Sequence, residues 1–193
     1  MTDALGNVTQ YSYDALGNET EVLHADGGSS KTTYDSMGRI VTETDELGAV
    51  LTYQYDANGN VISLSDDSGR TYTFEYDRNN NRTKETNPEG GVSIYAYDAA
   101  GRQISFTDPE GRTEAYTYDG ADRMTSVKNA LGEVSTSEYD KNGRLKKSTD
   151  GMGGASSFTY NGVGNMTSVT DPLGNITAFK YDETDNLSQT IDA

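Results

Sequence analysis

Apolar and polar residues alternate along the chain in short stretches that return every 21 residues. Clear examples are residues 50–55 (Val-Leu-Thr-Tyr-Gln-Tyr) and residues 113–118 (Thr-Glu-Ala-Tyr-Thr-Tyr). Strict alternation with β-branched and aromatic side chains predicts a β-strand whose two aromatic rings point to the same face. No stretch shows three turns of the 3.6-residue apolar spacing that predicts a helix. The pattern therefore predicts an all-β protein built from short strands.

A second kind of apolar stretch follows each of these strands. Residues 61–64 read Val-Ile-Ser-Leu and residues 166–169 read Met-Thr-Ser-Val, so the outer apolar residues are three positions apart. A regular strand cannot place residues three apart on one face, whereas a β-bulge adds one residue and restores the common face. We predict a bulge near the middle of these strands. An unbroken ladder through 61–64 and 166–169 would contradict this prediction.

Two turn signals separate the strands. The first turn reads Tyr-Asp-x-x-Gly-Arg/Asn, and the second reads Asp/Asn-x-x-Gly, with proline in second place at Pro88, Pro109 and Pro172. This order of residues is typical of a type I turn followed by a residue at positive φ, a common hairpin connection. In three first turns the glycine is replaced by a residue that tolerates the left-handed region. These replacements are Asn80, Asp122 and Asp185.

The two turns and two strands form one unit that is copied along the chain without insertion. The register tyrosines are Tyr13, Tyr34, Tyr55, Tyr76, Tyr97, Tyr118, Tyr139, Tyr160 and Tyr181. The register glycines of the second turns include Gly48, Gly69, Gly90, Gly111, Gly132 and Gly174. Such a period is the mark of a stacked array. We expect one array of about nine repeats over residues 1–193, starting and ending within a repeat and without a separate catalytic domain. Its tandem 21-residue hairpins would form one curled or spiralling antiparallel sheet.

Composition narrows the choice of partners. Hydrophobic residues make up 33% of the 193 residues, yet fourteen tyrosines and a fixed period argue against disorder. The net charge of -16 and the pI near 4.2 make nucleic acid and anionic lipid surfaces unfavourable partners. The chain has no cysteine, which excludes thiolate chemistry. It has neither an apolar run long enough for a membrane span nor a signal segment after Met1.

The repeat motif carries a family resemblance. Residues 98–119, Asp-Ala-Ala-Gly-Arg-Gln-Ile-Ser-Phe-Thr-Asp-Pro-Glu-Gly-Arg-Thr-Glu-Ala-Tyr-Thr-Tyr-Asp, resemble the Rhs/YD-repeat family and depart from its pattern at Gln103 alone. The resemblance extends over the full chain. It implies a piece of a large secreted or cell-surface protein, such as a bacterial Rhs or wall-associated toxin, the toxin-encapsulating component of an insecticidal complex, or an animal teneurin.

In that family the strands spiral into a hollow shell around a C-terminal cargo, and the repeats themselves are not catalytic. We find neither a variable toxin domain after the last repeat nor a closing segment that cuts the cargo free. The resemblance therefore implies a wall segment that is secreted or on the bacterial surface. Its partners would be other repeats or a toxin cargo.

Residues able to carry chemistry are scarce. His24 is the only histidine, and it stands where most second turns have Asp or Asn, so we interpret it as a turn variant. The acidic pairs Asp66–Asp67 and Asp108–Glu110 fit side chains that bond the amides of their own turns. Residues 151–154 are glycine-rich but lack the context of a phosphate-binding loop. We predict no catalytic, cofactor-binding or metal-binding residue, although dense carboxylates are compatible with weak calcium binding.

The tyrosines and arginines admit more than one interpretation. We expect the register tyrosines to pack across strands against Val61, Met124, Leu145, Met166 and Leu187. We expect Arg39, Arg102, Arg123 and Arg144 to contact nearby carboxylates or tyrosine rings. The leading hypothesis is a non-enzymatic structural module. One alternative is a carbohydrate-binding module that presents tyrosine with Asn and Asp, and another is a self-assembling array that forms filaments through its strand edges.

Overall fold

The computed structural model describes residues 1, 2, 4 and 6–192, and within this part of the chain it contains strands and turns but no helix. Among these described residues, no helix has the length and apolar character needed to span a membrane. The strands are β1 (Gln10–Tyr13), β2 (Glu19–Leu23), β3 (Ser29–Tyr34), β4 (Ile40–Thr44), β5 (Val50–Tyr55), β6 (Val61–Asp66), β7 (Thr71–Tyr76), β8 (Arg82–Thr86), β9 (Val92–Tyr97), β10 (Gln103–Thr107), β11 (Thr113–Tyr118), β12 (Met124–Lys128), β13 (Val134–Tyr139), β14 (Leu145–Thr149), β15 (Ala155–Tyr160), β16 (Met166–Thr170), β17 (Ile176–Tyr181) and β18 (Leu187–Ile191).

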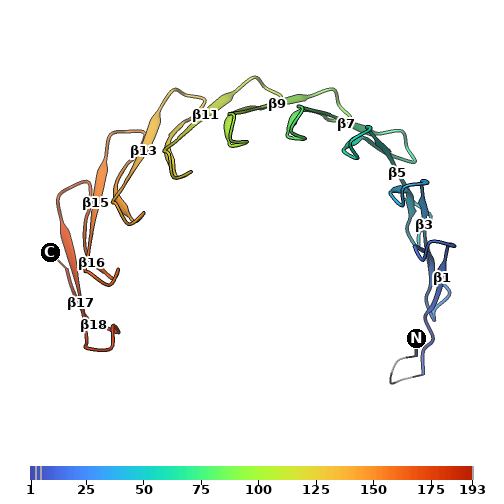
Figure 1. The fold of residues 1–193 in the computed structure, drawn as a ribbon, viewed down its shortest axis with the longest axis horizontal. Coiled ribbons are helices and arrows are strands. Elements are labelled where there is room, and N and C mark those ends of the chain that lie inside the picture. The colour runs from blue at the N-terminus through green and yellow to red at the C-terminus, as the bar shows by residue number, and fades with distance from the viewer. Residues whose placement is uncertain (3, 5, 193) are drawn as a thin grey trace. The chain divides into compact units, whose positions relative to one another are not determined.

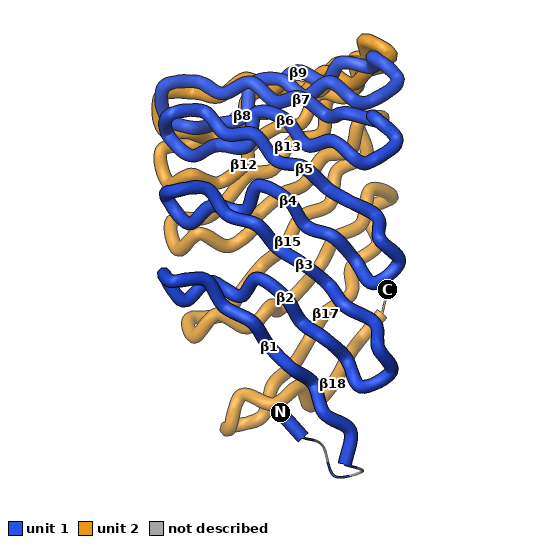
Figure 2. The backbone as a smooth tube through the Cα atoms, turned by 90° about the vertical axis from the view of Figure 1, so that its right-hand side faces the viewer, with its two compact units in different colours: residues 1–94 blue, residues 95–193 orange. Residues whose placement is uncertain are grey.

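The chain divides into two units, residues 1–94 and residues 95–193 (Figure 2). Within each unit, consecutive strands pair antiparallel, and a strand contacts only the strands before and after it. Each unit is thus an up-and-down series of hairpins, and its strands follow a curved path (Figure 1). The predicted all-β class and the tandem antiparallel hairpins are confirmed. The division into domains stays a prediction.

The predicted bulges are present in the strands that leave the first turns. In the β5–β6 ladder Gln54 pairs with Ser63 and Tyr55 pairs with Val61, which leaves Ile62 as the extra residue. Thr167 takes the same place in the β15–β16 ladder. The bulge turns the outer apolar residues to the side of the aromatic rings, because Tyr53 and Tyr55 lie opposite Leu64 and Val61. The bulge lies at the second residue of each strand.

Both turns have the predicted backbone. In the second turn at Asp108, the N–H of Gly111 donates to the carbonyl of Asp108 at 2.9 Å, and the N–H of Asp108 donates to the carbonyl of Arg112 at 3.0 Å. Gly111 has a φ of +80°, a left-handed conformation that ordinary residues avoid. Three first turns place Asn80, Asp122 and Asp185 at φ of 64°, 61° and 63°. The prediction that these residues replace glycine at positive φ is therefore confirmed.

The two faces of the sheet differ in chemistry. One face, which we call the aromatic face, carries the register tyrosines and their cross-strand partners, such as Tyr118 opposite Met124 and Tyr139 opposite Leu145. The other, which we call the hydroxyl face, carries many Ser and Thr, as where Thr33 and Thr42 place their hydroxyls 2.6 Å apart, and also Lys and Glu, as where Lys84 contacts Glu75 at 2.8 Å. None of the described residues is fully buried, because each unit is one layer thick. The expected cross-strand pairs form, but they half-bury the rings instead of enclosing them.

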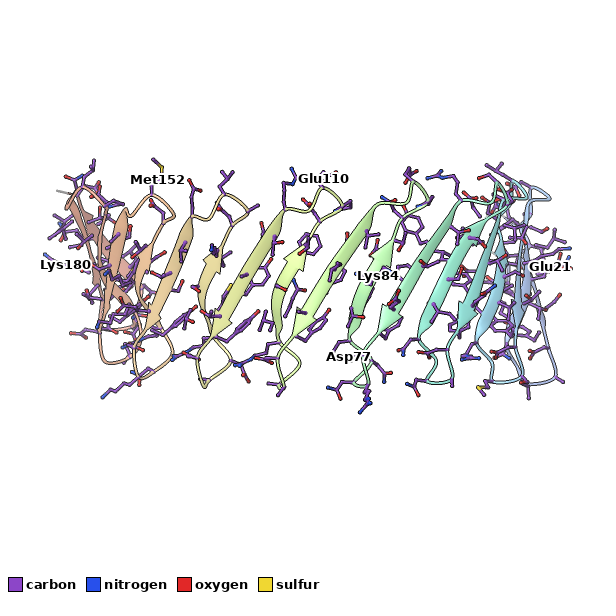
Figure 3. The ribbon with its side chains drawn as sticks, turned by 90° about the horizontal axis from the view of Figure 1, so that it is seen from above. Glu21, Asp77, Lys84, Glu110, Met152 and Lys180 are labelled. Carbon is purple, nitrogen blue, oxygen red and sulfur yellow. The ribbon has the colours of Figure 1, made fainter. Side chains whose placement is uncertain are left out.

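Hairpin geometry places the first and second turns at opposite ends of the strands. Glu110 and Met152, both at the tips of second turns, lie at the same edge of their unit (Figure 3). The first turns of that unit line its other edge. The repeated polar contacts described next are made along this second edge.

Candidate functional site

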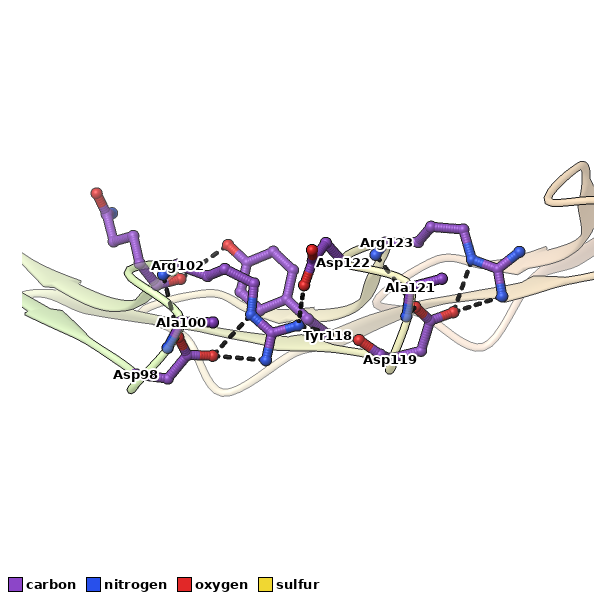
Figure 4. A network of polar contacts seen from close by, with 9 residues as sticks. Asp98, Ala100, Arg102, Tyr118, Asp119, Ala121, Asp122 and Arg123 are labelled. Atoms are coloured by element: carbon purple, nitrogen blue, oxygen red, sulfur yellow. Dashed lines mark hydrogen bonds and ion pairs between the residues drawn. The ribbon is translucent and has the colours of Figure 1, made fainter.

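Each first turn is held by a side-chain oxygen of the Asp or Asn that opens it. In the turn at Asp119, Oδ1 accepts hydrogen bonds from the N–H groups of Ala121 at 2.9 Å and Arg123 at 3.1 Å (Figure 4). Its Oδ2 accepts from Nε of Arg123 at 2.7 Å. Asp and Asn suit this position because a short side-chain acceptor can mimic a backbone carbonyl. The aspartate therefore belongs to its own turn and is not presented to a ligand.

The arginine after the turn joins one repeat to the next. Nε and Nη2 of Arg102 contact Oδ2 of Asp98 at 2.7 and 2.6 Å, and Nη1 donates to the carbonyl of Asp119 at 3.0 Å and to Oδ1 of Asp122 at 2.8 Å (Figure 4). The guanidinium also lies over the ring of Tyr118, with its carbon 4.9 Å from the ring centroid. Arginine suits this position because its planar, forked guanidinium can donate two hydrogen bonds to a carboxylate and also stack on an aromatic ring. The same bridge recurs at Arg39, Arg123 and Arg144.

The register tyrosine joins the repeats in the opposite direction. The hydroxyl of Tyr139 donates to the carbonyl of Met124 at 2.9 Å, fifteen residues earlier. The β12–β13 ladder stops at Ser126 opposite Thr136, so this carbonyl lies beyond the last ladder pair. The hydroxyl satisfies an acceptor that the diverging strands leave open. Equivalent bonds are made by Tyr34, Tyr55, Tyr76, Tyr118, Tyr160 and Tyr181.

The turn carboxylates are held in the charged form. The side-chain hydrogen bond from Arg123, assisted by N–H donors of the turn, lowers the pKa of Asp119 below its ordinary value of 3.8. At Asp140 the backbone N–H of Arg144 is the main cause of a lowered pKa. Hydrogen bonds from their own turns likewise lower the pKa of Asp14, Asp35, Asp56, Asp66, Asp77, Asp98, Asp171 and Asp182. None of these groups is tuned toward neutral pH, where general acid–base catalysis works best.

Two tyrosines of the aromatic face bind carboxylates instead. The hydroxyl of Tyr53 donates to Glu43 at 2.5 Å, and this bond together with burial raises the pKa of Tyr53 to about 12. Burial and a 2.7 Å hydrogen bond to Glu114 raise the pKa of Tyr116 to about 12. Both hydroxyls therefore stay protonated and act as donors at neutral pH.

A sequence profile of the RHS repeat family matches residues 1–29, 34–71, 55–92, 97–134, 139–176 and 160–193. These segments leave only short gaps. The chain belongs to the RHS repeat family. A search of curated proteins found no match.

Solved structures share the fold of these RHS repeats. The structure described as TcdB2-TccC3-Cdc42 aligns with 95% of this chain and 11% of its own, at a TM-score of 0.70 and 18% identity. TcdB2-TccC3 without its hypervariable C-terminal region aligns with 99% of this chain and 13% of its own, at a TM-score of 0.68 and 17% identity. A Tc holotoxin pore from Photorhabdus luminescens aligns at a TM-score of 0.53 and 15% identity, over 93% of this chain and 13% of its own. The chain thus spans about a tenth of the length of these structures.

The remaining sequence candidates occupy ordinary places in the RHS repeats. His24 opens a second turn, as expected, and its Nε2 lies 3.0 Å from Oε1 of Glu46 in the next second turn. Oδ1 of Asp66 accepts from two N–H groups of its own turn, and Asp108 and Glu110 both contact Arg112. Among the described residues, no three His, Cys, Asp or Glu side chains are grouped so that they could hold a metal ion.

Sequence reasoning missed the hydroxyl bond of the RHS register tyrosine and the arginine bond to the next turn. The sequence does contain a signal for the hydroxyl bond of the register tyrosine. All nine register positions are Tyr, whereas Phe stands two residues earlier at Phe74, Phe158 and Phe179. If the ring alone mattered, Phe would also occur at the register position. The arginine bond has no such signal, because Asn fills the same place in several repeats.

The hydroxyl bond can be tested at Tyr139. We expect Tyr139→Phe to lower the free energy of unfolding by about 1 kcal/mol, since it leaves the Met124 carbonyl without its donor. Urea unfolding followed by circular dichroism measures the change. The matched control is Tyr72→Phe, whose hydroxyl makes no hydrogen bond in the described part of the chain. Equal effects of the two variants would contradict a role for the hydroxyl.

The arginine bridge can be tested at Arg123. We expect Arg123→Lys to lower the Tm by roughly 3 °C, because lysine has neither the fork for Asp119 nor the flat surface for Tyr139. Calorimetry measures the change. Arg78→Lys is the control, since Arg78 is exposed at a turn tip. A variant as stable as the control would show that charge alone is needed.

Proposed function

We propose that the chain is a non-catalytic wall segment of a large secreted or cell-surface RHS protein. The observation that carries this proposal is the use of the polar side chains. The Asp, Arg and Tyr residues that a catalytic or binding site would need are engaged in holding turns and joining repeats. Such contacts stabilise the turns and join each repeat to the next, which is what an extended repeat array needs.

The geometry of a unit suits a wall. Each strand contacts only its neighbours, so the sheet grows by adding repeats and needs no interior core. A one-layer curved sheet encloses space with little protein mass. The fold shared with TcdB2-TccC3 supports this role. In this proposal the partner is a toxin cargo enclosed by the wall, and the protein acts outside the cell.

Electron microscopy and protease protection test the proposal on the natural protein that carries these repeats. We expect hollow particles in which a segment outside the RHS repeats resists proteinase K. Replacing Arg102, Arg123 and Arg144 together by serine should expose that segment, whereas Arg78→Ser should not. Solid rods, or a chain that is cleaved throughout, would refute a wall.

The non-catalytic part of the proposal has its own test. We expect no hydrolytic turnover when the purified chain is offered glycosidic, peptide and ester substrates. Turnover that one point substitution abolishes would overturn this expectation.

Carbohydrate binding remains the alternative for the aromatic face. Guanidinium groups cover the rings of Tyr55, Tyr118, Tyr139 and Tyr160, which leaves less ring surface for a sugar to stack on. A glycan array distinguishes the two roles. Reproducible binding that is lost in Tyr53→Ala or Tyr116→Ala would favour the binding module.

A further inference from the structure

The aromatic face has two gaps in its row of rings. Two positions before the register tyrosine, seven repeats have Tyr or Phe, whereas the other two have Thr32 and Ser137. On the neighbouring strands Thr32 lies opposite Glu43, and Ser137 lies opposite Ser148. A ring is therefore missing at two places, one in each unit.

Each gap is a pocket in the aromatic face. The pocket at Ser137 has a volume of about 160 Å³. The pocket at Thr32, which we call the Thr32 pocket, has a volume of about 510 Å³ and falls in the size range of small-ligand sites. The residues of the aromatic face that line it are Ser30, Thr32, Glu43, Asp45, Leu51 and Asp66. The missing ring thus leaves an open space bounded by strands β3 to β6.

The next repeat shows what kind of side chain this position accommodates. There Tyr53 is half-buried opposite Leu64, and its hydroxyl donates to Glu43 at 2.5 Å. Thr32 supplies no ring, and Leu51 beside the pocket stays 40% exposed. An aromatic side chain from another molecule therefore matches the empty position, and its burial against Leu51 is favourable.

The rim of the Thr32 pocket has an unpaired carboxylate oxygen. Oδ1 of Asp45 accepts from two N–H groups of its own turn, both at 2.9 Å. In the second turn at Asp108, Nε of Arg112 donates to Oδ2 of the aspartate, whereas Ala49 holds the equivalent place after Asp45. Nothing in the described part of the chain donates to Oδ2 of Asp45. This oxygen can therefore accept from a cationic group that arrives with a ring.

The charge of the Thr32 pocket also favours a cation. Glu43 and Asp66 add two further carboxylates to its lining. Lys31 points to the hydroxyl face, where its Nζ lies 3.4 Å from Oε1 of Glu21, so it does not neutralise them. The pocket at Ser137, by contrast, has no charged residue in its lining. The two pockets thus share a missing ring and differ in charge.

We propose that the Thr32 pocket binds a segment of a partner polypeptide in which an aromatic residue and a Lys or Arg are two positions apart. Thr32 faces Glu43 across the ladder, and Asp45 stands two positions beyond Glu43. Side chains two positions apart in an extended segment point to the same side. The ring therefore enters the pocket over Leu51 while the cation contacts Oδ2 of Asp45. The proposal does not rest on the wall role described above.

Nuclear magnetic resonance titration of the ¹⁵N-labelled full chain tests the proposal. The peptide acetyl-Lys-Ser-Phe-Ser-Lys-amide, with a lysine two positions to each side of the ring, should shift the amide signals of Thr32, Glu43 and Leu51. We expect a dissociation constant of roughly 1 mM. Replacing Phe in the peptide by Ala should weaken binding roughly ten-fold, and replacing both Lys by Glu roughly five-fold.

Three results of this titration would overturn the proposal. One is the lack of any shift at about 10 mM peptide. Another is binding of tyramine, which has the ring and the ammonium without a main chain, as tightly as the peptide, since the pocket would then be a small-molecule site. The third is a shift of the same signals with protein concentration alone, which would identify a second copy of the chain as the occupant.

Variants of the chain locate the site. Thr32→Tyr supplies the ring that seven other repeats have, so it should fold and abolish binding, whereas Ser137→Tyr fills the other gap and should leave binding unchanged. Asp45→Asn should weaken binding about three-fold. Its control is Asp108→Asn, because Arg112 already occupies Oδ2 of Asp108. Unchanged binding by Thr32→Tyr would refute the pocket. Neither outcome bears on hollow particles, so the two proposals fail separately.

Discussion

We expect Gly111→Val to lower the free energy of unfolding by about 2 kcal/mol, which corresponds to roughly 4 to 8 °C in Tm. Gly111 has a φ of +80°, and nothing lies within 4 Å of the place where a Cβ would stand. The cost is therefore one of backbone conformation and not of a clash. A β-branched residue has no comfortable rotamer or backbone state in the left-handed region.

The control for this experiment comes from the chain itself. Asn80 holds the glycine position of its first turn at a φ of 64°. Gly111→Asn should therefore cost less than half as much as Gly111→Val. Conversely, Asp122→Gly should leave the backbone of its turn unstrained, although it removes a partner of Arg102. Denaturant unfolding of the variants measures these differences, and equal losses for Val and Asn would show that the conformation at φ +80° is not the cause.

Acid should unfold the array over a narrow range below about pH 4. The pKa values of the turn aspartates are lowered by hydrogen bonds from their own turns, as at Asp56, Asp77 and Asp171. A carboxylate with a lowered folded pKa contributes its full stabilisation above its ordinary value of 3.8 and loses it as the pH falls through the folded value. Because these groups recur in nearly every repeat, the losses add.

Repulsion between the negative charges of the chain has the opposite effect on stability as the pH falls. The net charge of -16 at pH 7 shrinks toward the pI near 4.2, which relieves repulsion as the solution is acidified. We expect stability to rise slightly from pH 7 to about pH 5 and to fall steeply below about pH 4. Circular dichroism across this range measures the curve. Flat stability down to pH 2 would contradict the role given to the turn carboxylates.

A triple variant separates these two effects. Asn161 and Asn129 show that Asn can open a first and a second turn, since the Oδ1 of each accepts from two N–H groups of its own turn. Replacing Asp56, Asp77 and Asp171 by Asn removes three titrating groups and keeps the Oδ1 acceptor for the N–H groups of each turn. It gives up the Oδ2 acceptor for the side-chain amides of Asn60, Asn81 and Asn175. The acid midpoint should move to lower pH. Replacing Glu89, Glu110 and Glu183, which lie exposed at turn tips, by Gln changes the charge equally but should leave the midpoint in place.

Local chemistry accounts for what the sequence could predict. The bulge at Ile62 follows from an apolar spacing that a flat strand cannot satisfy. The positive φ of Asn80 follows from the position that glycine fills in other repeats. Such features depend on residues a few positions apart, where steric rules are strong. The contacts of Arg102 with a carboxylate and a tyrosine ring were also expected, and both are observed.

Features that depend on residues far apart in the chain were harder to predict from the sequence. The bond from Tyr139 to the Met124 carbonyl depends on where the ladder between two strands ends, and sequence spacing does not give that point. The sequence also did not predict that both faces of the sheet are exposed. Cross-strand pairing of tyrosine with aliphatic residues suggests an inner layer, but a one-layer sheet leaves both members half-exposed. How far a ring is buried depends on what covers the sheet, and the repeat itself does not encode that.

The bridging contacts also bear on how such genes change length. The bonds described above from register tyrosine hydroxyls to main-chain carbonyls span fifteen residues, and the arginine bonds to the main-chain carbonyl of the next turn span seventeen, so each contact lies within one repeat and its neighbour. Unequal recombination that inserts or removes one whole repeat recreates the same contacts at the new junction. Adding or removing one whole 21-residue repeat therefore keeps both kinds of bridge, whereas an insertion that is not a multiple of the repeat breaks both at the place where it falls.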